Sequence, residues 1–337
     1  MTAQIRRLDS IGFAREDDAA KGTSVAVSTG LFAGISSGQL KSVVEFEDIA
    51  PAIGQIAYGQ EKKIIKKFSE LNFSAPVKAD WIGHVLTGLL GSVSSANAGG
   101  ETTVREHTIT VLNSAEVPAY TGYMIDGIQS DKATYMTFKK LTLTCKAGGA
   151  LMADVEMIGQ GRENGTGTAA FVTSNFFTAG MLTTKIAAAI TNLSGASALP
   201  TTDLKLTIER DVTPIYNHGS VEPAKFIAGP LKVSLELGIM YEATTYRALY
   251  EAGTDKAVSL SWQDTATTIG SAENPGLDII IAKMYIMKAE RPDGIDEADE
   301  EKLMLEATYD IDEADTNKFI KAILTNTNTA TAYTEPA

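Results

Sequence analysis

One glycine-centred segment, residues 135–161, constrains the fold of this chain more than any other. Two runs of alternating apolar and polar residues flank the four residues Ala147-Gly148-Gly149-Ala150. Such alternation is typical of strands, and the glycines suit a tight reversal between them. The apolar set is Leu141, Leu143, Cys145, Leu151, Ala153, Val155 and Met157, and the polar set is Thr142, Thr144, Asp154 and Glu156. The segment therefore predicts an antiparallel hairpin with one apolar and one polar face.

A second pair of alternating runs lies at 203–210 and 231–237. Each buried Leu, Ile or Val would contribute roughly 1.5–3 kcal/mol, so these runs predict a second wall of the core. The apolar members are Leu204, Leu206, Ile208, Leu231, Val233, Leu235 and Leu237, and the polar ones are Lys205, Thr207, Glu209, Lys232, Ser234 and Glu236. The polar faces are mixed in charge and have few aromatic residues, unlike a platform on which nucleic-acid bases stack.

The remaining segments predict further strands and two helices. The best helix is 80–91, where apolar residues recur at helical spacing, Asp80 can cap the start and Gly91 can end it. A second short helix is expected within 241–253, and 92–100 is expected to be a loop. Further strands are expected at 41–48, 64–73, 102–112, 258–262, 277–287, 302–309 and 319–325. The fold class is therefore mainly β, a sandwich or barrel with one or two short packing helices.

The division of the chain follows from the same patterns. Residues 1–40 have poor periodicity and are expected to form an N-terminal arm or a long loop, and 331–337 a C-terminal tail. Between them, 41–330 form one β domain with a possible loop insertion at 161–200. The acidic run 293–301 is expected to be a solvated loop rather than a calcium site, because it lacks the ligand order of a calcium-binding loop.

Composition excludes some functions. The formal net charge of −13 disfavours tight binding to nucleic acid or to an anionic membrane. Because Cys145 is the single cysteine, an internal disulfide is impossible and a buried thiol is expected. There is no apolar signal core and no run of about 20 apolar residues. We therefore expect a protein folded in a reducing cytoplasm.

Candidate chemical groups are sparse. His84, His107 and His218 are far apart and lack metal-ligand spacing, so no metal and no cofactor is expected. Asp154 and Glu156 could act as a carboxylate pair, but a polar sheet face explains them better. The glycines at 159–165 indicate a turn rather than a dinucleotide-binding loop, since the spacing differs and no helix follows.

The order of these segments resembles the major tail tube protein of long-tailed bacteriophages, over about residues 64–327. The resemblance begins with a strand, a proline and the helix ending in Leu-Leu-Gly91, and it includes the hairpin that starts at Phe138, turns at Ala-Gly-Gly and ends at Gly161. Its other parts are Arg105-Glu-His-Thr-Ile-Thr110, Pro-x-Tyr-Thr at 118–121, Leu206-Thr-Ile-Glu-Arg-Asp, the strand 229–238, a helix near 246–251 and Gly253-Thr-Asp.

The resemblance implies a structural virion protein and not an enzyme. Six subunits would close a ring through a continuous inner barrel, and stacked rings would form a tube through which DNA and a length-setting protein pass. Expected partners are further copies of the chain, the tape-measure protein, the tail terminator and the baseplate or tip proteins, with DNA in transit and no membrane. The protein would be assembled in the host cytoplasm and located in the virion tail. From strand alternation, the candidate lumen-facing residues are Asp154, Glu156, Glu209 and Glu236.

Three other interpretations remain open. The chain could be the tube of a contractile tail or another virion β protein. A carbohydrate-binding sandwich would need exposed aromatic residues, whereas Trp81 and Trp262 stand in apolar surroundings. A hydrolase would have to use Asp154 and Glu156.

Overall fold

The computed structural model describes residues 9–27, 32–49, 61–126, 129–166, 169, 171, 174–240, 245–290, 300–313 and 317–334. Strands dominate it and only two α-helices occur in this part, which confirms the mainly β fold class. The first nine strands are β1 Ser10–Arg15, β2 Phe32–Ala33, β3 Ser37–Ile49, β4 Glu61–Pro76, β5 Gly91–Asn97, β6 Arg105–Val111, β7 Tyr120–Ile125, β8 Asp131–Lys146 and β9 Met152–Gly159. The others are β10 Glu163–Asn164, β11 Leu182–Ala187, β12 Ala198–Leu199, β13 Thr201–Tyr216, β14 Pro223–Met240, β15 Lys256–Gln263, β16 Gly276–Glu290, β17 Glu300–Ala307 and β18 Ile320–Asn326.

The main sheet is an antiparallel ladder in the order β3-β4-β9-β8-β13-β14-β17-β16. It contains both hairpins expected from the sequence, β8–β9 and β13–β14, and pairs them through β8 and β13. Leu143 lies opposite Leu206, so the two apolar faces form one continuous wall. At the β8–β9 turn, Gly148 has a φ of 75°, which favours glycine.

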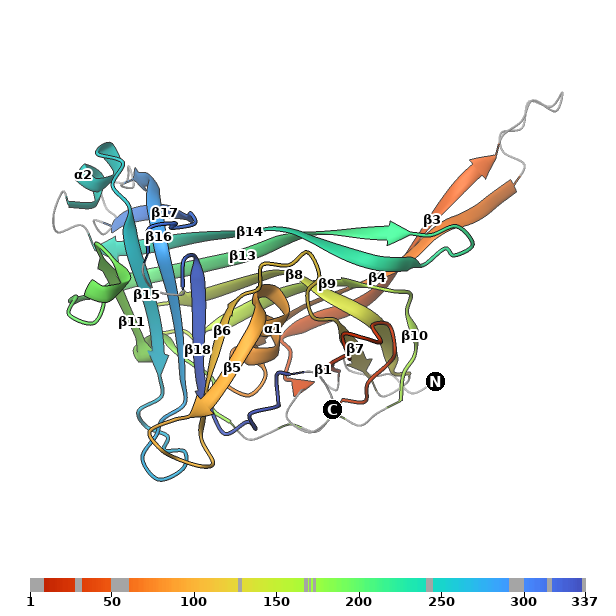
Figure 1. Ribbon diagram of the computed structural model, residues 1–337, viewed down its shortest axis with the longest axis horizontal. Coiled ribbons are helices and arrows are strands. Elements are labelled where there is room, and N and C mark those ends of the chain that lie inside the picture. Colours follow the sequence, from red (N-terminus) through yellow and green to blue (C-terminus); the bar gives the residue numbers. More distant parts are fainter. Residues whose placement is uncertain are drawn as a thin grey trace.

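A second sheet has the order β12-β11-β15-β16-β18-β6-β5. The first part of β16 pairs with β18 as far as Ile281 and with β15 as far as Met284, whereas from Met284 onward it pairs with β17 of the main sheet. In Figure 1 the strands of the second sheet run across those of the main sheet. The apolar faces of the two sheets enclose the core, where Leu143, Leu206 and Ile279 are fully buried.

Helix α1 (Ile82–Leu90) lies in the angle between the two sheets and contacts β5, β6, β8 and β13 (Figure 1). All nine of its residues are buried. Its end at Gly91 is confirmed, because Gly91 has a φ of 101° and donates its N–H to the Thr87 carbonyl. The expected cap is wrong: Trp81 stands at the N-cap position without a side-chain bond, and the Asp80 carboxylate accepts a hydrogen bond from Ser174 instead.

The N-terminal segment was expected to be an arm or a long loop, but the structure places two strands there. β1 pairs with β7 from Ser10↔Ile125 to Arg15↔Tyr120 and also with β2, in a small sheet of order β2-β1-β7-β8-β10. Ile11 and Phe13 are fully buried. β1 shows no alternation because its first five residues are all buried, and β2 has only two residues.

Other segments also differ from expectation. Residues 91–97 form β5 instead of a loop, as an edge strand of small polar residues paired with β6. The possible loop insertion at 161–200 contains β10, β11 and β12 and two 3-10 helices, Ala179–Met181 and Ile190–Asn192. In the expected C-terminal tail, Tyr333 is fully buried.

The second expected helix is present as α2 (Thr245–Glu251), which contacts β16. Residues 241–244 and most of the acidic run, 293–299, lie outside the described residues. Within the described part, no helix is long and apolar enough to cross a membrane.

Candidate functional site: a polar sheet face and a groove beside it

The polar face of the main sheet carries lysines and carboxylates in cross-strand rows. One row runs through Glu156 on β9, Lys140 on β8, Glu209 on β13 and Lys232 on β14, each opposite the next. Two rows further along the same face, Lys205 lies opposite Glu236. Since opposite charges alternate across the strands, each row is favourable to the pairing itself.

All four candidate lumen residues lie on this polar face. The Lys140 Nζ is 3.6 Å from the Glu156 Oε1, and the Lys205 Nζ is 2.6 Å from the Glu236 Oε1. Asp154 is exposed and lies opposite Thr142. The face is therefore mixed in charge rather than continuously acidic.

Asp154 and Glu156, the carboxylate pair that a hydrolase would use, do not line an enclosed pocket together. A shallow pocket of about 230 Å³ beside Lys140 includes Glu156 and Glu209 but not Asp154. Asp154 and Glu156 are both exposed. Trp81 and Trp262, which a carbohydrate-binding face would have to display, are buried with exposed fractions of 2% and 0%.

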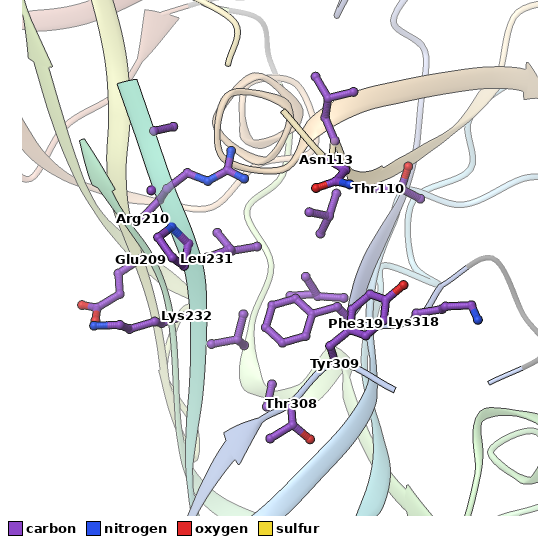
Figure 2. Close-up of a pocket in the computed structure, with 18 of the residues that line it drawn as sticks. Thr110, Asn113, Glu209, Arg210, Leu231, Lys232, Thr308, Tyr309, Lys318 and Phe319 are labelled. Carbon is purple, nitrogen blue, oxygen red and sulfur yellow. The ribbon is translucent and has the colours of Figure 1, made fainter. Parts of the chain in front are cut away.

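A larger groove opens beside the polar face, where β17 leaves β14 (Figure 2). β14 pairs with β17 from Met240 only as far as Ser234, because β17, which lies between β14 and β16, ends at Ala307. The groove has a volume of about 1240 Å³. Its apolar lining comes from both sheets and includes Val111, Leu112, Leu231, Val233, Phe319 and Ile320.

Arg210 projects into the apolar side of this region. It continues the alternation of Leu204, Leu206 and Ile208 and is only 6% exposed. Its Nη1 donates to the Leu89 carbonyl at the end of α1, over 3.3 Å, and its Nε has no partner. Burial lowers the pKa of the guanidinium, and no carboxylate of the described residues offsets that cost. A cation at a helix C-terminus is favourable, but a guanidinium has five N–H donors and the Leu89 carbonyl accepts from only one of its nitrogens.

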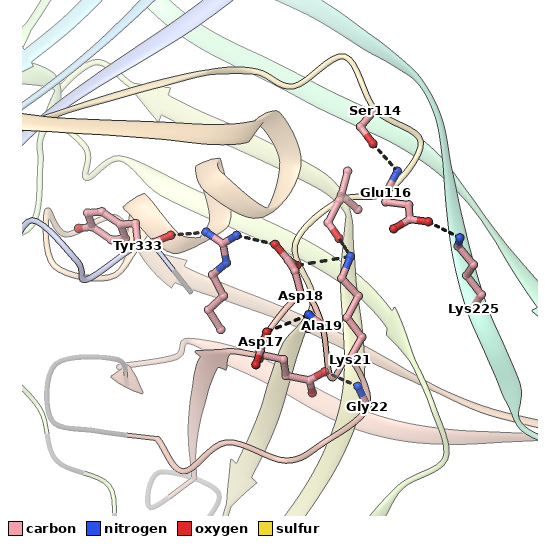
Figure 3. A network of polar contacts seen from close by, with 12 residues as sticks. Asp17, Asp18, Ala19, Lys21, Gly22, Ser114, Glu116, Lys225 and Tyr333 are labelled. Atoms are coloured by element: carbon pink, nitrogen blue, oxygen red, sulfur yellow. Dashed lines mark hydrogen bonds and ion pairs between the residues drawn. The ribbon is translucent and has the colours of Figure 1, made fainter. Parts of the chain in front are cut away.

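A polar network fixes the N-terminal segment to the body (Figure 3). The Glu16 carboxylate is fully buried and accepts hydrogen bonds from the backbone N–H groups of Gly22 and Tyr135 and from the Thr121 hydroxyl. Burial raises the pKa of Glu16, although these donors act in the opposite direction. Arg15 donates to the Tyr333 carbonyl over 2.6 Å, which joins the two ends of the described chain.

Two of the three histidines lie around Tyr333. The His84 and His107 rings each contact the Tyr333 ring edge-on, with centroids 4.7 Å apart. Burial, with smaller contributions from Arg15 and His107, lowers the pKa of His84 to about 3, so its ring is neutral. His218 lies apart from them on an exposed turn. A search of the described residues for three or more grouped His, Cys, Asp or Glu side chains that could hold a metal finds none.

Sequence reasoning located the polar face but missed the groove and the role of Tyr333. One signal for Arg210 was available, because it occupies the next apolar-face position after Ile208. The groove itself depends on where β17 leaves β14, which no local pattern reveals.

A comparison with protein families identifies the group to which the chain belongs. The family model described as phage tail tube protein matches residues 50–312, which is more than half of the chain and includes the polar face and α1. No curated protein matches the chain.

Proposed function

Since the chain belongs to the phage tail tube protein family and is a structural component of the virion tail, we propose that six copies close into a ring and that stacked rings form the tube. Before ejection the tube contains the tape-measure protein, and during ejection it is the conduit for DNA. Its ends meet the tail terminator and the baseplate or tip proteins. The subunit assembles in the host cytoplasm and has no catalytic role.

The polar face of the main sheet is the observation that carries this proposal. A wall facing passing DNA must neither bind the phosphates tightly nor offer surfaces on which bases stack. Lysines and carboxylates alternate on this face, as in the Glu156-Lys140-Glu209 row, so neither sign dominates locally. We assign Asp154, Glu156, Glu209 and Glu236 to the lumen wall on this basis.

Unpaired strand edges support assembly. In the described part, β3 pairs only with β4, and β14 has no strand partner beyond Ser234 on its outer edge. The β3–β4 hairpin extends away from the body (Figure 1) and exposes Phe46 and Ile64 by 58% and 46%. Open edges with exposed apolar side chains favour association, and a head-to-tail contact that closes into a ring can cover such edges in every copy.

Charge reversal tests the lumen assignment. Replacing Asp154, Glu156, Glu209 and Glu236 by lysine should make the wall basic and slow genome ejection severalfold, because phosphates would then bind it. The control is Glu251→Lys, which changes the charge on the exposed surface of α2. Ejection kinetics of phage carrying each variant, with tube length checked by electron microscopy, measure the effect. Normal ejection from basic-walled tubes would remove the assignment.

A further inference from the structure

We propose that residues 327–334, which we call the C-terminal strap, form a latch that acid opens: a proton on His84 expels the Tyr333 ring and releases the strap while the two sheets stay folded. The inference goes beyond the proposed function, since it concerns contacts within one copy and does not depend on ring assembly. Three features carry it. One buried ring holds the strap, the imidazole beneath that ring has no hydrogen-bond partner, and a neighbouring cation is itself part of the strap's anchor.

A single side chain buries itself between the strap and the body. Tyr333 is fully buried, whereas every other residue of the strap is half-buried or exposed. The turn within the strap is closed by its own backbone, because Ala332 donates to the Thr329 carbonyl over 3.0 Å and Thr334 donates to the Thr331 carbonyl over 3.2 Å. The strap can therefore leave the body as a unit, at the loss of one buried ring and the hydrogen bonds made to Tyr333.

The Tyr333 ring lies directly on the first turn of α1. A Cβ on Gly83 would collide with this ring, so no side chain separates the ring from the helix backbone at that point. The Tyr333 and His84 ring centroids are 4.7 Å apart, and His84 is 1% exposed. The strap faces water on its other side, where Thr329 and Thr331 are exposed. Departure of the Tyr333 ring therefore opens a path by which water reaches His84.

His84 has no group that would stabilise a proton while the strap is closed. Neither of its ring nitrogens has a hydrogen-bond partner. The charged and titratable groups that face it in the described part are Arg15 on β1, His107 on β6, Tyr120 on β7 and Tyr333 itself. None of these is a carboxylate that could pair with an imidazolium. A buried charge without a partner is strongly destabilising, so a proton on His84 favours the open strap, in which water solvates the ring.

The same proton weakens the backbone anchor of the strap. The Arg15 Nη1 donates to the Tyr333 carbonyl over 2.6 Å, and its Nη2 pairs with the Asp18 carboxylate over 3.0 Å (Figure 3). Burial, and then the positive charge of Arg15, lower the pKa of His84. A charged His84 would repel the guanidinium in return, and this guanidinium is the group that holds the strap backbone.

His107 differs from His84 because its ring is already hydrogen-bonded. Asn326 donates its Nδ2 to the Tyr333 hydroxyl, so its Oδ1 accepts from the His107 Nε2, over 3.1 Å. The other ring nitrogen, Nδ1, is 2.8 Å from the Ser95 hydroxyl, which can donate to a neutral ring and accept from a charged one. His107 therefore tolerates a proton in the closed state, and His84 is the group that senses acid.

Carboxypeptidase trimming of the full chain tests the latch, because the enzyme removes Tyr333 only from an open strap. The measured quantity is the rate of Tyr333 removal, read from the mass of the intact chain and divided by the rate for a synthetic peptide of residues 325–337 at the same pH. An exposed histidine has a pKa of about 6.5, so the open fraction, and with it this ratio, should rise about twenty-fold between pH 7 and pH 5. Far-UV circular dichroism of the chain should be the same at both pH values, because the sheets stay folded.

Two variants separate the sensor from the seat of the ring. His84→Phe should abolish the rise with acid, because phenylalanine keeps an aromatic ring against Tyr333 and binds no proton; His84→Leu serves the same purpose if phenylalanine does not fit. The matched control, His218→Gln on the exposed turn, should keep the full rise. Gly83→Ala should be trimmed at least about tenfold faster than the wild type already at pH 7, because its Cβ displaces the Tyr333 ring.

Three results would overturn the inference. The wild-type ratio could stay constant between pH 7 and pH 5, or the ratio could rise equally in both His84 variants. The sheet signal could also fall in step with trimming, which would mean that the whole chain unfolds and that no separate latch exists. None of these results bears on the proposed function, which is tested by the assembled tube.

Discussion

At the scale of single residues, the close packing around α1 depends on two glycines in the helix, Gly83 and Gly88. A Cβ added to Gly88 would collide with the Phe138 ring and approach Tyr120 to 3.1 Å. A Cβ added to Gly83 would collide with the Tyr333 ring. These glycines therefore let the helix approach aromatic residues of the core at the cost of helix propensity.

Gly88→Ala tests this packing. Alanine favours a helix by about 1 kcal/mol over glycine, but overpacking costs about 1–3 kcal/mol, so we expect a net loss of about 1 kcal/mol. Urea unfolding measures the change. Gly180→Ala is the control, since the nearest atom to its added Cβ would be the Thr178 hydroxyl at 3.9 Å. A more stable Gly88→Ala would show that the ring moves aside without cost.

His84 makes stability depend on pH. Its pKa is lowered to about 3 in the folded state by burial, against about 6.5 in the unfolded chain. Between these values the unfolded state binds a proton that the folded state does not, so stability falls as pH drops below about 6.5.

The wild type should lose about 2 kcal/mol of unfolding free energy through His84 between pH 7 and pH 5, and His84→Phe should not show this loss because phenylalanine binds no proton. Unfolding free energies of both proteins at the two pH values give the difference, with His218→Gln on the exposed turn as control. Parallel pH profiles for wild type and His84→Phe would contradict the assignment.

Alternation predicted the burial of individual residues well, because the side-chain period of a strand is fixed. Leu141, Val155 and Leu235 are buried as expected. The contacts of polar residues on the buried side could not be predicted. The donors around Glu16 come from residues as far along the chain as Tyr135, and only the folded chain brings them together.

At the scale of elements, the C-terminal segment is part of the core. The Tyr333 ring is fully buried between His84 and His107, and its hydroxyl accepts hydrogen bonds from the side-chain amides of Asn326 and Asn328. Its carbonyl accepts from Arg15. The last residues of the described chain therefore stabilise α1 and β18 together.

Tyr333→Ala should destabilise the protein by about 3–5 kcal/mol, as for other buried aromatic residues. Tyr333→Phe keeps the ring and should cost about 1 kcal/mol, because the two amides lose one acceptor. Thermal and urea unfolding of both variants measure these costs. An unchanged Tyr333→Ala would show that the segment is a dispensable tail.

Elements with a strong period were predictable and those without one were not. Helix α1 and the strands β8, β9, β13 and β14 were located from sequence, although β13 and β14 extend further at both ends than the alternating runs. Strand β5 has the composition of a loop and is a strand because it pairs with β6. Short edge strands of this kind depend on their partners more than on their own residues.

At the scale of the whole molecule, the two faces of the main sheet differ in environment. Its apolar face forms the core with the second sheet and α1, and its polar face remains in water with Lys140, Glu156 and Glu209 in one row. The polar face could be predicted from alternation, whereas its charge balance could not, because cross-strand register decides which charges are neighbours. In the ring that we propose, this polar face is turned toward the centre.

The most direct test of this claim is a cryo-electron microscopy map of the assembled protein, resolved well enough to trace β8, β9, β13 and β14. The account predicts a hollow tube of stacked rings in which Asp154, Glu156, Glu209 and Glu236 face the bore. A tube with these four residues on its outer surface, or a protein that stays monomeric at every concentration tested, would contradict it.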